Sequence, residues 1–361
     1  MEVTAIEQSV SEDGSINVRV KIAQKSDLQL NFQGAEQLPF LNDCVFLSLY
    51  IQSMQEGTDL TFPDKFPVSA MLVENLDKHQ NIFTKWYNEH LHPIDVNVKT
   101  VTQDLEASGK VSLFSGGIDS YYTYVEKQRE LSHVFLCIGM DIQLEEQKKI
   151  DLAVVQYKDF ARKHNKKLLI ATTNVRHVFP GAKLSTQHAA LFTALVLAYG
   201  LETLYIPASH NIDELFPWGS HLLTDPLLSN GFTQVIHHGA VARTEKTAGI
   251  AENKDALDSI RICNSSEEFN CGECEKCLRT MFALAVLKKE TDSLPLLQNK
   301  LQFLIKIKIY NDSQATFWQD NYQLAMKHQC FELAKYAKAI VRSYQWRQWI
   351  KQGISLLRNR A

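Results

Sequence analysis

Between residues 111 and 237 the chain alternates short apolar segments with longer amphipathic ones, and this alternation constrains the fold more than any other feature. Short apolar runs bounded by turn residues indicate buried strands, and the longer segments have helical periodicity. Strands that alternate with helices form a parallel sheet covered on both faces. We therefore predict an α/β fold with a doubly wound parallel sheet, whose ligands bind beyond the carboxyl ends of the strands. The predicted strands are 111–114, 134–139, 167–171, 204–207 and 234–237, and the predicted helices are 119–128, 145–163 and 187–199.

The first part of the chain has a different pattern and predicts a separate α+β domain over residues 1–105. It contains no motif that indicates a function. The polar stretch 102–110, which includes Ser108 and Gly109, has the composition of a linker. The predicted strands here are 16–21, 28–32 and 96–101, and the predicted helices are 42–54 and 72–90.

The last part, residues 291–361, predicts a basic helical extension. From residue 301 onward the chain has ten lysine or arginine residues against three carboxylates, although the whole chain has a net charge of −3. Such a surface suits an acidic partner or nucleic acid, but an amphipathic helical cap with a solvated basic face explains it more simply. The aromatic residues interleaved with these charges are Trp318, Tyr322, Tyr344, Trp346 and Trp349, and the predicted helices of this end of the chain are 279–289, 314–326 and 334–357.

The composition of the chain indicates its cellular compartment but says little about its chemistry. Residues 1–14 are acidic and hold no apolar run of signal-peptide length, and no stretch of ~18 apolar residues occurs. We therefore expect a cytoplasmic protein that does not bind a membrane. Seven cysteines in such a protein are free thiols or metal ligands before they are structural disulfides.

The first chemical motif lies between the predicted strand 111–114 and the helix that follows it. The sequence VSLFSGGIDSYYTY, residues 111–124, passes from an apolar strand through a glycine turn into a helix. Backbone N–H groups of such a turn, together with the N-terminus of the helix, form a site for an anion. A carboxylate beside phosphates is repulsive unless a cation bridges them, so Asp119 suggests Mg²⁺. The candidate nucleotide-binding residues are Ser115, Gly116, Gly117, Ile118, Asp119 and Ser120.

This motif differs from the Walker loop and from the dinucleotide fingerprint. It resembles the PP-loop of the ATP pyrophosphatase superfamily. The resemblance implies that the loop grips the pyrophosphate of ATP while a substrate oxygen attacks the α-phosphate, so that the substrate receives AMP and pyrophosphate leaves.

The second motif is a group of four cysteines within residues 263–277, here called the cysteine loop. The spacing C-x7-C-x2-C-x2-C offers four thiolates to one tetrahedral Zn²⁺ ion, and a closed site of this kind is structural. An iron–sulfur cluster and a redox or persulfide-carrying pair are the alternatives. The candidate ligands are Cys263, Cys271, Cys274 and Cys277.

The loop of residues 115–120, here called the glycine loop, is followed later in the chain by the cysteine loop and Arg279. This combination narrows the resemblance to the 7-cyano-7-deazaguanine synthase branch of the superfamily. That branch implies activation of a carboxylate by ATP, followed by attack of ammonia. The match covers about residues 111–285, within a predicted PP-loop domain over 106–290.

The segment 210–227 departs from that branch, although Asp213 matches its pattern. A polar loop after a parallel strand is where a substrate pocket belongs, and Trp218 offers a ring to stack on. A surface loop with a half-buried tryptophan explains the segment equally well. The remaining candidate substrate residues are Ser220, His221 and Asp225.

Arg243 and Lys246 lie one helical turn apart at the start of a predicted helix. Two cations so placed would neutralise a triphosphate and stabilise departing pyrophosphate, and with Asp119 they are the candidate catalytic residues. An exposed basic helix start paired with neighbouring glutamates is the simpler alternative.

The resemblance implies an ATP-dependent adenylating enzyme that activates a carboxylate or carbonyl oxygen for attack by a nitrogen nucleophile and so forms a C–N bond, with ATP, Mg²⁺ and Zn²⁺. Its acceptor would be a carboxylate-bearing small molecule, nucleobase or protein, and a homodimer is compatible with the sequence. One alternative is a tRNA thiolation enzyme of the same superfamily, which would need an accessible, low-pKa cysteine pair. The other is a non-catalytic protein that senses nucleotide and binds a partner through its zinc loop and basic end.

Overall fold

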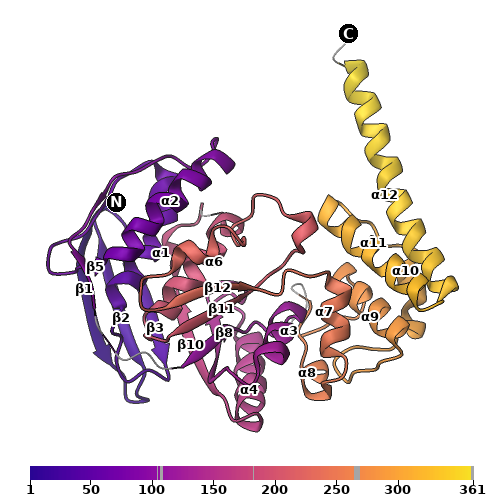
Figure 1. Cartoon of the computed structure of the whole chain (residues 1–361), viewed down its shortest axis with the longest axis horizontal. Coiled ribbons are helices and arrows are strands. Elements are labelled where there is room, and N and C mark those ends of the chain that lie inside the picture. The colour runs from indigo at the N-terminus through magenta and orange to yellow at the C-terminus, as the bar shows by residue number, and fades with distance from the viewer. Residues whose placement is uncertain (104, 106–108, 182, 264–268, 359–361) are drawn as a thin grey trace. The chain divides into compact units, whose positions relative to one another are not determined.

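The structure, a computed structural model, describes residues 1–103, 105, 109–181, 183–263 and 269–358. The predicted linker residue Ser108 therefore lies outside the described residues. The chain forms two compact units, whose elements are labelled in Figure 1. Unit 1 consists of Met1–Ser115 and Glu126–Ala240, and unit 2 consists of Gly116–Val125 and Val241–Ala361.

Unit 1 is built on an eight-stranded mixed sheet. The strands from β8 to β12 pair in parallel, and β1, β2 and β3 pair antiparallel at one end. The predicted α/β class with a largely parallel central sheet is confirmed. In sheet order the strands are β1 (Val3–Val10), β2 (Ile16–Ile22), β3 (Leu28–Gln33), β10 (Lys167–Thr173), β9 (His133–Ile138), β8 (Lys110–Leu113), β11 (Thr203–Pro207) and β12 (Gln234–His238).

The order of the parallel strands reverses next to β8. From β8 the chain adds β9 and then β10 on one side, and it adds β11 and then β12 on the other. Ligands of open α/β sheets bind beyond the carboxyl ends of the strands at such a reversal. The chain leaves β8 at this point through Phe114 and Ser115, which begin the glycine loop.

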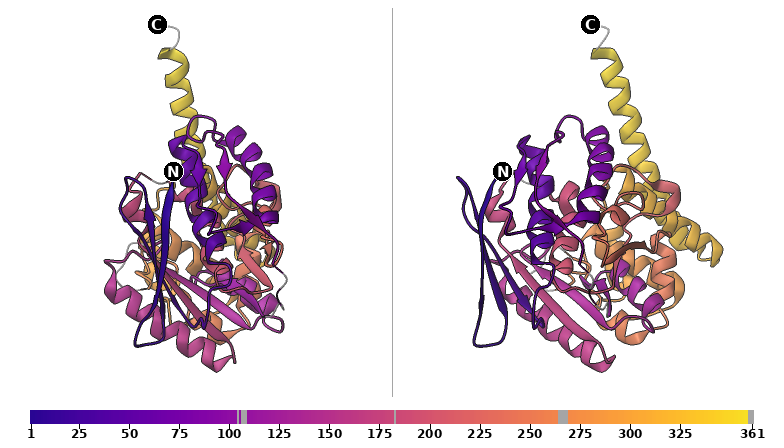
Figure 2. Two further views of the ribbon diagram at one scale, coloured as in Figure 1. Left: turned by 90° about the vertical axis from the view of Figure 1, so that its left-hand side faces the viewer. Right: turned by 60° about the vertical axis from the view of Figure 1, so that its left-hand side comes forward.

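The N-terminal strands do not form a sheet of their own, which corrects the predicted separate domain over residues 1–105. β3 pairs with β10 over the register Thr173↔Leu30 to Ile170↔Gln33. The alternating side chains Leu28, Leu30 and Phe32 are buried in the same core as β10. Figure 2 shows β1 and β2 as the indigo end of this sheet.

Helices cover both faces of the sheet in unit 1. The core on one face contains α1 (Leu41–Glu56) and α6 (Leu184–Leu197), and α1 is buried along most of its length. On the other face α4 (Gln147–Lys163) packs against β9 and β10. The predicted strand 96–101 is two short strands in separate two-stranded sheets. The remaining elements are α2 (Ala70–Trp86), α5 (Val175–Val178), β4 (Leu60–Thr61) with β6 (Val96–Asn97), and β5 (Val68–Ser69) with β7 (Thr100–Val101).

Unit 2 is helical, and α9 (Glu275–Leu287) is its central helix. This helix is buried from Cys277 to Leu284 and packs against α7 (Arg243–Ile250) and α11 (Asp312–Lys327). Trp318 of α11 is fully buried, and its indole Nε1 donates to Glu275 at 2.9 Å. The predicted boundary at residue 290 therefore does not divide compact units. The other helices are α3 (Ile118–Lys127), α8 (Lys254–Asp258), α10 (Leu301–Leu304) and α12 (Phe331–Arg358).

Candidate functional site

The glycine loop forms a tight turn that is stabilised by hydrogen bonds and leads directly into α3. Gly116 has a φ of 76°, a conformation that favours glycine, and its carbonyl accepts the backbone N–H of Arg261 at 2.7 Å. The Ser120 hydroxyl donates to the carbonyl of Gly117 at 2.9 Å, so this serine stabilises the turn. The first N–H groups of a helix have no acceptor within the helix, so the start of α3 is the kind of site at which an anion can bind. The carbonyl of Ser115, in unit 1, accepts the hydroxyl of Tyr157 at 3.1 Å.

Asp119, in the first turn of α3, lies between two cations from the first turn of α7. Its Oδ1 accepts from Nζ of Lys246 at 2.9 Å, and its Oδ2 lies 3.1 Å from Nη2 of Arg243. The Lys246 side chain is 1% exposed, and the side chains of Asp119 and Arg243 are about one-fifth exposed. The three candidate catalytic residues therefore form one cluster within unit 2, here called the Asp119 cluster.

Electrostatics keep the Asp119 carboxylate ionised. Burial alone would raise the pKa of Asp119, but Arg243 and Lys246 outweigh burial and the pKa lies below its ordinary value. Burial lowers the pKa of Lys246, and Asp119 opposes that shift. The cluster holds two cations against one carboxylate, so it can accept a further anion.

Two residues that sequence reasoning did not include in the site lie beside this cluster. The guanidinium carbon of Arg279, on α9, lies 4.1 Å from the centre of the Phe317 ring, and that of Arg243 lies 5.4 Å from the same ring. Phe317 belongs to α11, within the predicted C-terminal extension. In the sequence Arg279 stands out only because it follows the cysteine loop, and no periodicity distinguishes Phe317 from an ordinary core residue.

The four predicted cysteines come together as a metal-binding group. Their Sγ atoms all lie within 4.8 Å of one another. Sγ of Cys263 is 3.6 Å from that of Cys271 and 3.8 Å from that of Cys274, and the Cys271–Cys277 distance is 3.9 Å. Four sulfurs about 2.3 Å from one tetrahedral ion are about 3.8 Å apart, so the spacing fits a single ion such as Zn²⁺.

The surroundings of the sulfurs also fit a bound metal ion. The backbone N–H groups of Glu273 and Cys274 point to Sγ of Cys271 at 3.4 and 3.3 Å, an arrangement that stabilises a thiolate. Cys263 and Cys277 are buried. A four-iron cluster would place each sulfur on a different iron atom and spread the sulfurs farther apart, so the geometry favours one ion. Residues 264–268 of the loop lie outside the described residues.

The predicted substrate residues Ser220, His221 and Asp225 are buried in unit 1 and bond to one another. Oδ2 of Asp225 accepts from the hydroxyl of Ser220 at 2.8 Å and contacts Nδ1 of His237 at 2.7 Å, while Oδ1 accepts the backbone N–H of His221 at 2.9 Å. Asp225 itself has no exposed surface. These contacts give the residues a role in holding their loop together.

The other two predicted substrate residues lie nearer the surface. Asp213 is exposed on the short helix Ile212–Glu214, and Trp218 is half-buried. The Trp218 ring packs near the rings of Phe216 and His210, with centroids 5.9 and 6.1 Å away. Trp218 therefore belongs to a small aromatic cluster at the surface of unit 1.

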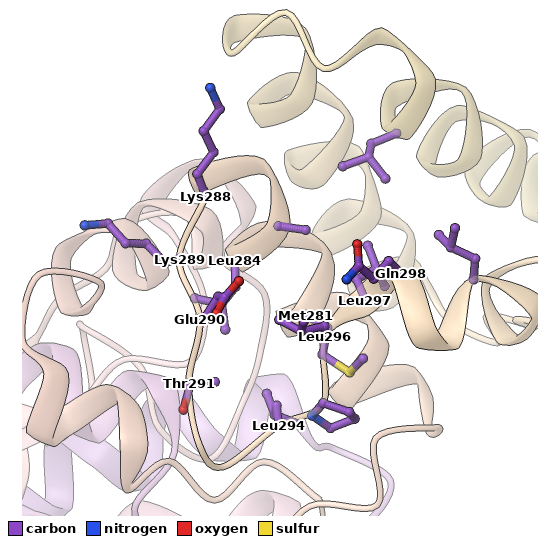
Figure 3. A pocket seen from close by; sticks show the side chains of 14 residues that line it. Met281, Leu284, Lys288, Lys289, Glu290, Thr291, Leu294, Leu296, Leu297 and Gln298 are labelled. Atoms are coloured by element: carbon purple, nitrogen blue, oxygen red, sulfur yellow. The ribbon is translucent and has the colours of Figure 1, made fainter.

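Two of the cavities formed by the described residues lie elsewhere and are large enough to consider as sites. One, of about 370 Å³ in unit 2, is mainly apolar and lies between α9 and the segment that follows it, with Lys288 and Lys289 at its edge (Figure 3). The other, of about 430 Å³ in unit 1, is polar and lies beyond the carboxyl ends of β9 and β10. No side chain of the Asp119 cluster lines either cavity.

Comparisons with protein-family models, curated proteins and solved structures found no match for this chain. Among the described helices, none has both the length and the apolar character needed to cross a bilayer.

Proposed function

We propose that the chain is an ATP-dependent adenylating enzyme of the PP-loop type, similar to 7-cyano-7-deazaguanine synthase. It would convert ATP to AMP and pyrophosphate while activating a carboxylate for attack by a nitrogen nucleophile. One observation carries the proposal: Asp119 of the glycine loop meets Lys246 and Arg243, although Asp119 and Lys246 are 127 residues apart in the chain. A glycine turn before a helix is common, but one joined to two partly or fully buried cations has the charge that a phosphate site needs.

The chemistry follows from these charges. The loop N–H groups would hold the β- and γ-phosphates, and a carboxylate oxygen of the acceptor would attack the α-phosphorus as its bond to the bridging oxygen breaks. Lys246 and Arg243 would stabilise the negative charge that then develops on pyrophosphate. The nitrogen nucleophile would attack the acyl carbon, and AMP would leave.

The residues present also fit a magnesium ion beside the phosphates. Asp119 is ionised and about one-fifth exposed, and carboxylate oxygens are preferred ligands of Mg²⁺. When bound, the ion would neutralise phosphate charge. Asp119 would then exchange its contacts with the two cations for the metal, while phosphate oxygens take its place beside Lys246 and Arg243.

The fold of unit 1 supports the same interpretation. The strand that precedes the glycine loop, β8, is the strand beside which the order of the sheet reverses. This is the position from which loops of doubly wound sheets bind nucleotides. A PP-loop enzyme requires its loop at that position.

The cysteine loop has a structural role in this proposal. Its sulfurs have the spacing of a single tetrahedral ion, and two of the four are buried. A sulfur-carrying pair would need accessible thiols that are not bound to metal. With a metal ion bound, no thiol of the loop would be free to carry sulfur, which supports C–N bond formation over the thiolation alternative; without the ion Cys271 is exposed.

The test is turnover of ATP by purified full-length protein with Mg²⁺, ammonia and a panel of small carboxylates. We expect AMP and pyrophosphate in equal amounts, dependent on both the carboxylate and ammonia. Arg243→Met should reduce this rate by about 100-fold or more, because one cation on the leaving group contributes about 3 kcal/mol.

Lys288→Met is the matched control, since it removes one positive charge from an exposed position at the end of α9. Its rate should equal that of the wild type. Formation of ADP and phosphate, or AMP formation that Arg243→Met leaves unchanged, would refute the proposal.

A further inference from the structure

Arg279 is a buried cation with few partners. Its side chain is 8% exposed, and among the described residues Nε and Nη1 have no hydrogen-bond acceptor. The nearest carboxylate oxygen, Oε1 of Glu275, is 3.6 Å from Nε and already accepts the indole N–H of Trp318. A buried guanidinium with unused donors is costly, which indicates that a partner is missing.

The position of Arg279 indicates where that partner would bind. Phe317 lies against the guanidinium groups of both Arg279 and Arg243, with ring-centre distances of 4.1 and 5.4 Å. Nε of Arg243 is also buried without an acceptor among the described residues. The two arginines with unused donors therefore contact the same ring, and one of them, Arg243, also pairs with Asp119.

The local charge indicates the sign of the missing partner. Arg243, Lys246 and Arg279 supply three positive charges, and Asp119 and Glu275 supply two negative ones. Among these five described side chains the excess charge is positive, although Cys274 of the cysteine loop also acts on Arg279, and this charge accompanies unsatisfied N–H donors. An anion rich in acceptor oxygens would satisfy both.

We propose that Arg279 is a third phosphate-binding cation, whose guanidinium, with its unsatisfied N–H groups, donates to the pyrophosphate group of the nucleotide and to free pyrophosphate. The identity of this anion rests on the proposed function. A planar guanidinium can give two parallel hydrogen bonds to phosphate oxygens, which an ammonium cannot do.

The structure also holds Arg279 in place without an anion. Its backbone carbonyl accepts from Nδ2 of Asn321 on α11 at 3.1 Å, and the Phe317 ring covers its guanidinium. It lies two residues after the metal-ligand candidate Cys277, on the same helix. The cysteine loop and α11 thus position a residue of the phosphate site.

The experiment measures binding of pyrophosphate, and separately of ATP, to full-length protein of verified zinc content by titration calorimetry. We expect Arg279→Met to weaken pyrophosphate binding about 10- to 100-fold, as for loss of hydrogen bonds to a charged group. Arg279→Lys should recover only part of this loss, because lysine keeps the positive charge but cannot give the two parallel hydrogen bonds of a guanidinium. Lys288→Met, which removes an exposed charge from the same helix, should change binding less than about 2-fold.

Unfolding separates a binding role from a structural one. Methionine keeps the apolar contact with Phe317 and removes a buried, poorly paired charge, so Arg279→Met should unfold at the same urea concentration as wild type or a higher one. A lower unfolding midpoint together with unchanged pyrophosphate binding would assign Arg279 a structural role and overturn the inference.

Failure of this inference is distinguishable from failure of the proposed function. If Arg279→Met binds pyrophosphate as tightly as wild type while wild type still forms AMP, the inference alone is overturned. If wild type binds neither pyrophosphate nor ATP, both are overturned.

Discussion

The contact between Asp119 and Lys246 predicts a strong energetic coupling in the stability of unit 2. Asp119→Asn leaves the Lys246 ammonium, which is 1% exposed, beside an amide in place of a carboxylate. Breaking a fully buried pair costs about 3–5 kcal/mol. The amide oxygen still accepts from Nζ and Arg243 is partly hydrated, so we expect a lower cost of about 2–3 kcal/mol.

Lys246→Met and the double variant complete a double-mutant cycle with Asp119→Asn, and their costs follow from the same contacts. Lys246→Met leaves Asp119 with Arg243 at 3.1 Å, so we expect a cost of about 1–2 kcal/mol. The double variant removes both charges and should cost no more than Lys246→Met alone. The coupling free energy is then at least the cost of Asp119→Asn alone, about 2–3 kcal/mol, because the single costs do not add.

Urea unfolding of the four metal-loaded full-length proteins, followed by tryptophan fluorescence, measures this cycle. Lys254 and Asp258 are the control pair. They are one turn apart on α8, and Nζ of Lys254 lies 2.7 Å from Oδ2 of Asp258, but the Lys254 side chain is 74% exposed. This control cycle should show no measurable coupling, because solvent screens the pair. Additive costs in the Asp119–Lys246 cycle would refute the buried ion pair on which the proposed site depends.

The pH dependence of the same variants has a definite sign. The pKa of Asp119 is lower in the folded protein than in the unfolded chain, so the stability that Asp119 contributes is present above the unfolded value of about 3.9. It is lost as the pH falls through the folded value. The difference in unfolding free energy between wild type and Asp119→Asn should therefore be constant near neutral pH and shrink below about pH 4.

Three further predictions concern other parts of the chain. Gly139→Ala should cost about 3 kcal/mol or more in urea unfolding, since its Cβ would lie 1.8 Å from the carbonyl oxygen of Thr173, whereas Gly14→Ala, with a similar φ but no atom within 4 Å, should cost about 1 kcal/mol. Asp225→Asn should lower the unfolding free energy by about 2–4 kcal/mol, because it disrupts three hydrogen bonds of a buried carboxylate; an unchanged free energy with a raised KM would make Asp225 a substrate ligand. In zinc-loaded native protein a thiol reagent should rapidly modify Cys330 alone of the seven cysteines, and a chelator should expose the thiols of the cysteine loop; rapid labelling of that loop before chelation would contradict a closed metal site.

Local sequence patterns were sufficient to place most elements of the fold. The helix predicted at 145–163 is α4 (Gln147–Lys163), and the strand predicted at 204–207 is β11 (Thr203–Pro207). Periodicity identifies such elements because each must bury one face. It could not identify the pairing of β3 with β10, since a two-residue period defines which face of a strand is buried but not its partner. The N-terminal strands therefore looked like a separate domain.

The same limit applies to the candidate site. The glycine loop and the cysteine loop are each one continuous segment, so the spacing of residues within each segment was sufficient to predict its candidate ligands. Phe317 and Arg279 meet only through the packing of α11 on α9, and a single aromatic or basic residue in a helical pattern carries no sign of what will lie over it. The sequence also could not show the contacts of Asp225, because the donors that surround it come together only in the folded loop.

The Asp119 cluster and the neighbouring Arg279 differ from a purely structural ion pair in their charges and donors. A purely structural ion pair would match its charges and satisfy its donors, yet here Arg279 and Arg243 both keep buried N–H groups without acceptors among the described residues. Unsatisfied buried donors lower the stability of the unbound protein, and an incoming anion recovers that free energy as binding affinity. On the proposed function Asp119 would have two roles: it pairs with Lys246 in the structure, and it would become available to a metal ion if phosphate oxygens replaced it beside Lys246. A nucleotide without a divalent cation would leave Asp119 facing the phosphates as an uncompensated like charge. The arrangement therefore predicts that ATP binds tightly only with Mg²⁺, and that Asp119→Asn makes binding of free pyrophosphate less dependent on the metal.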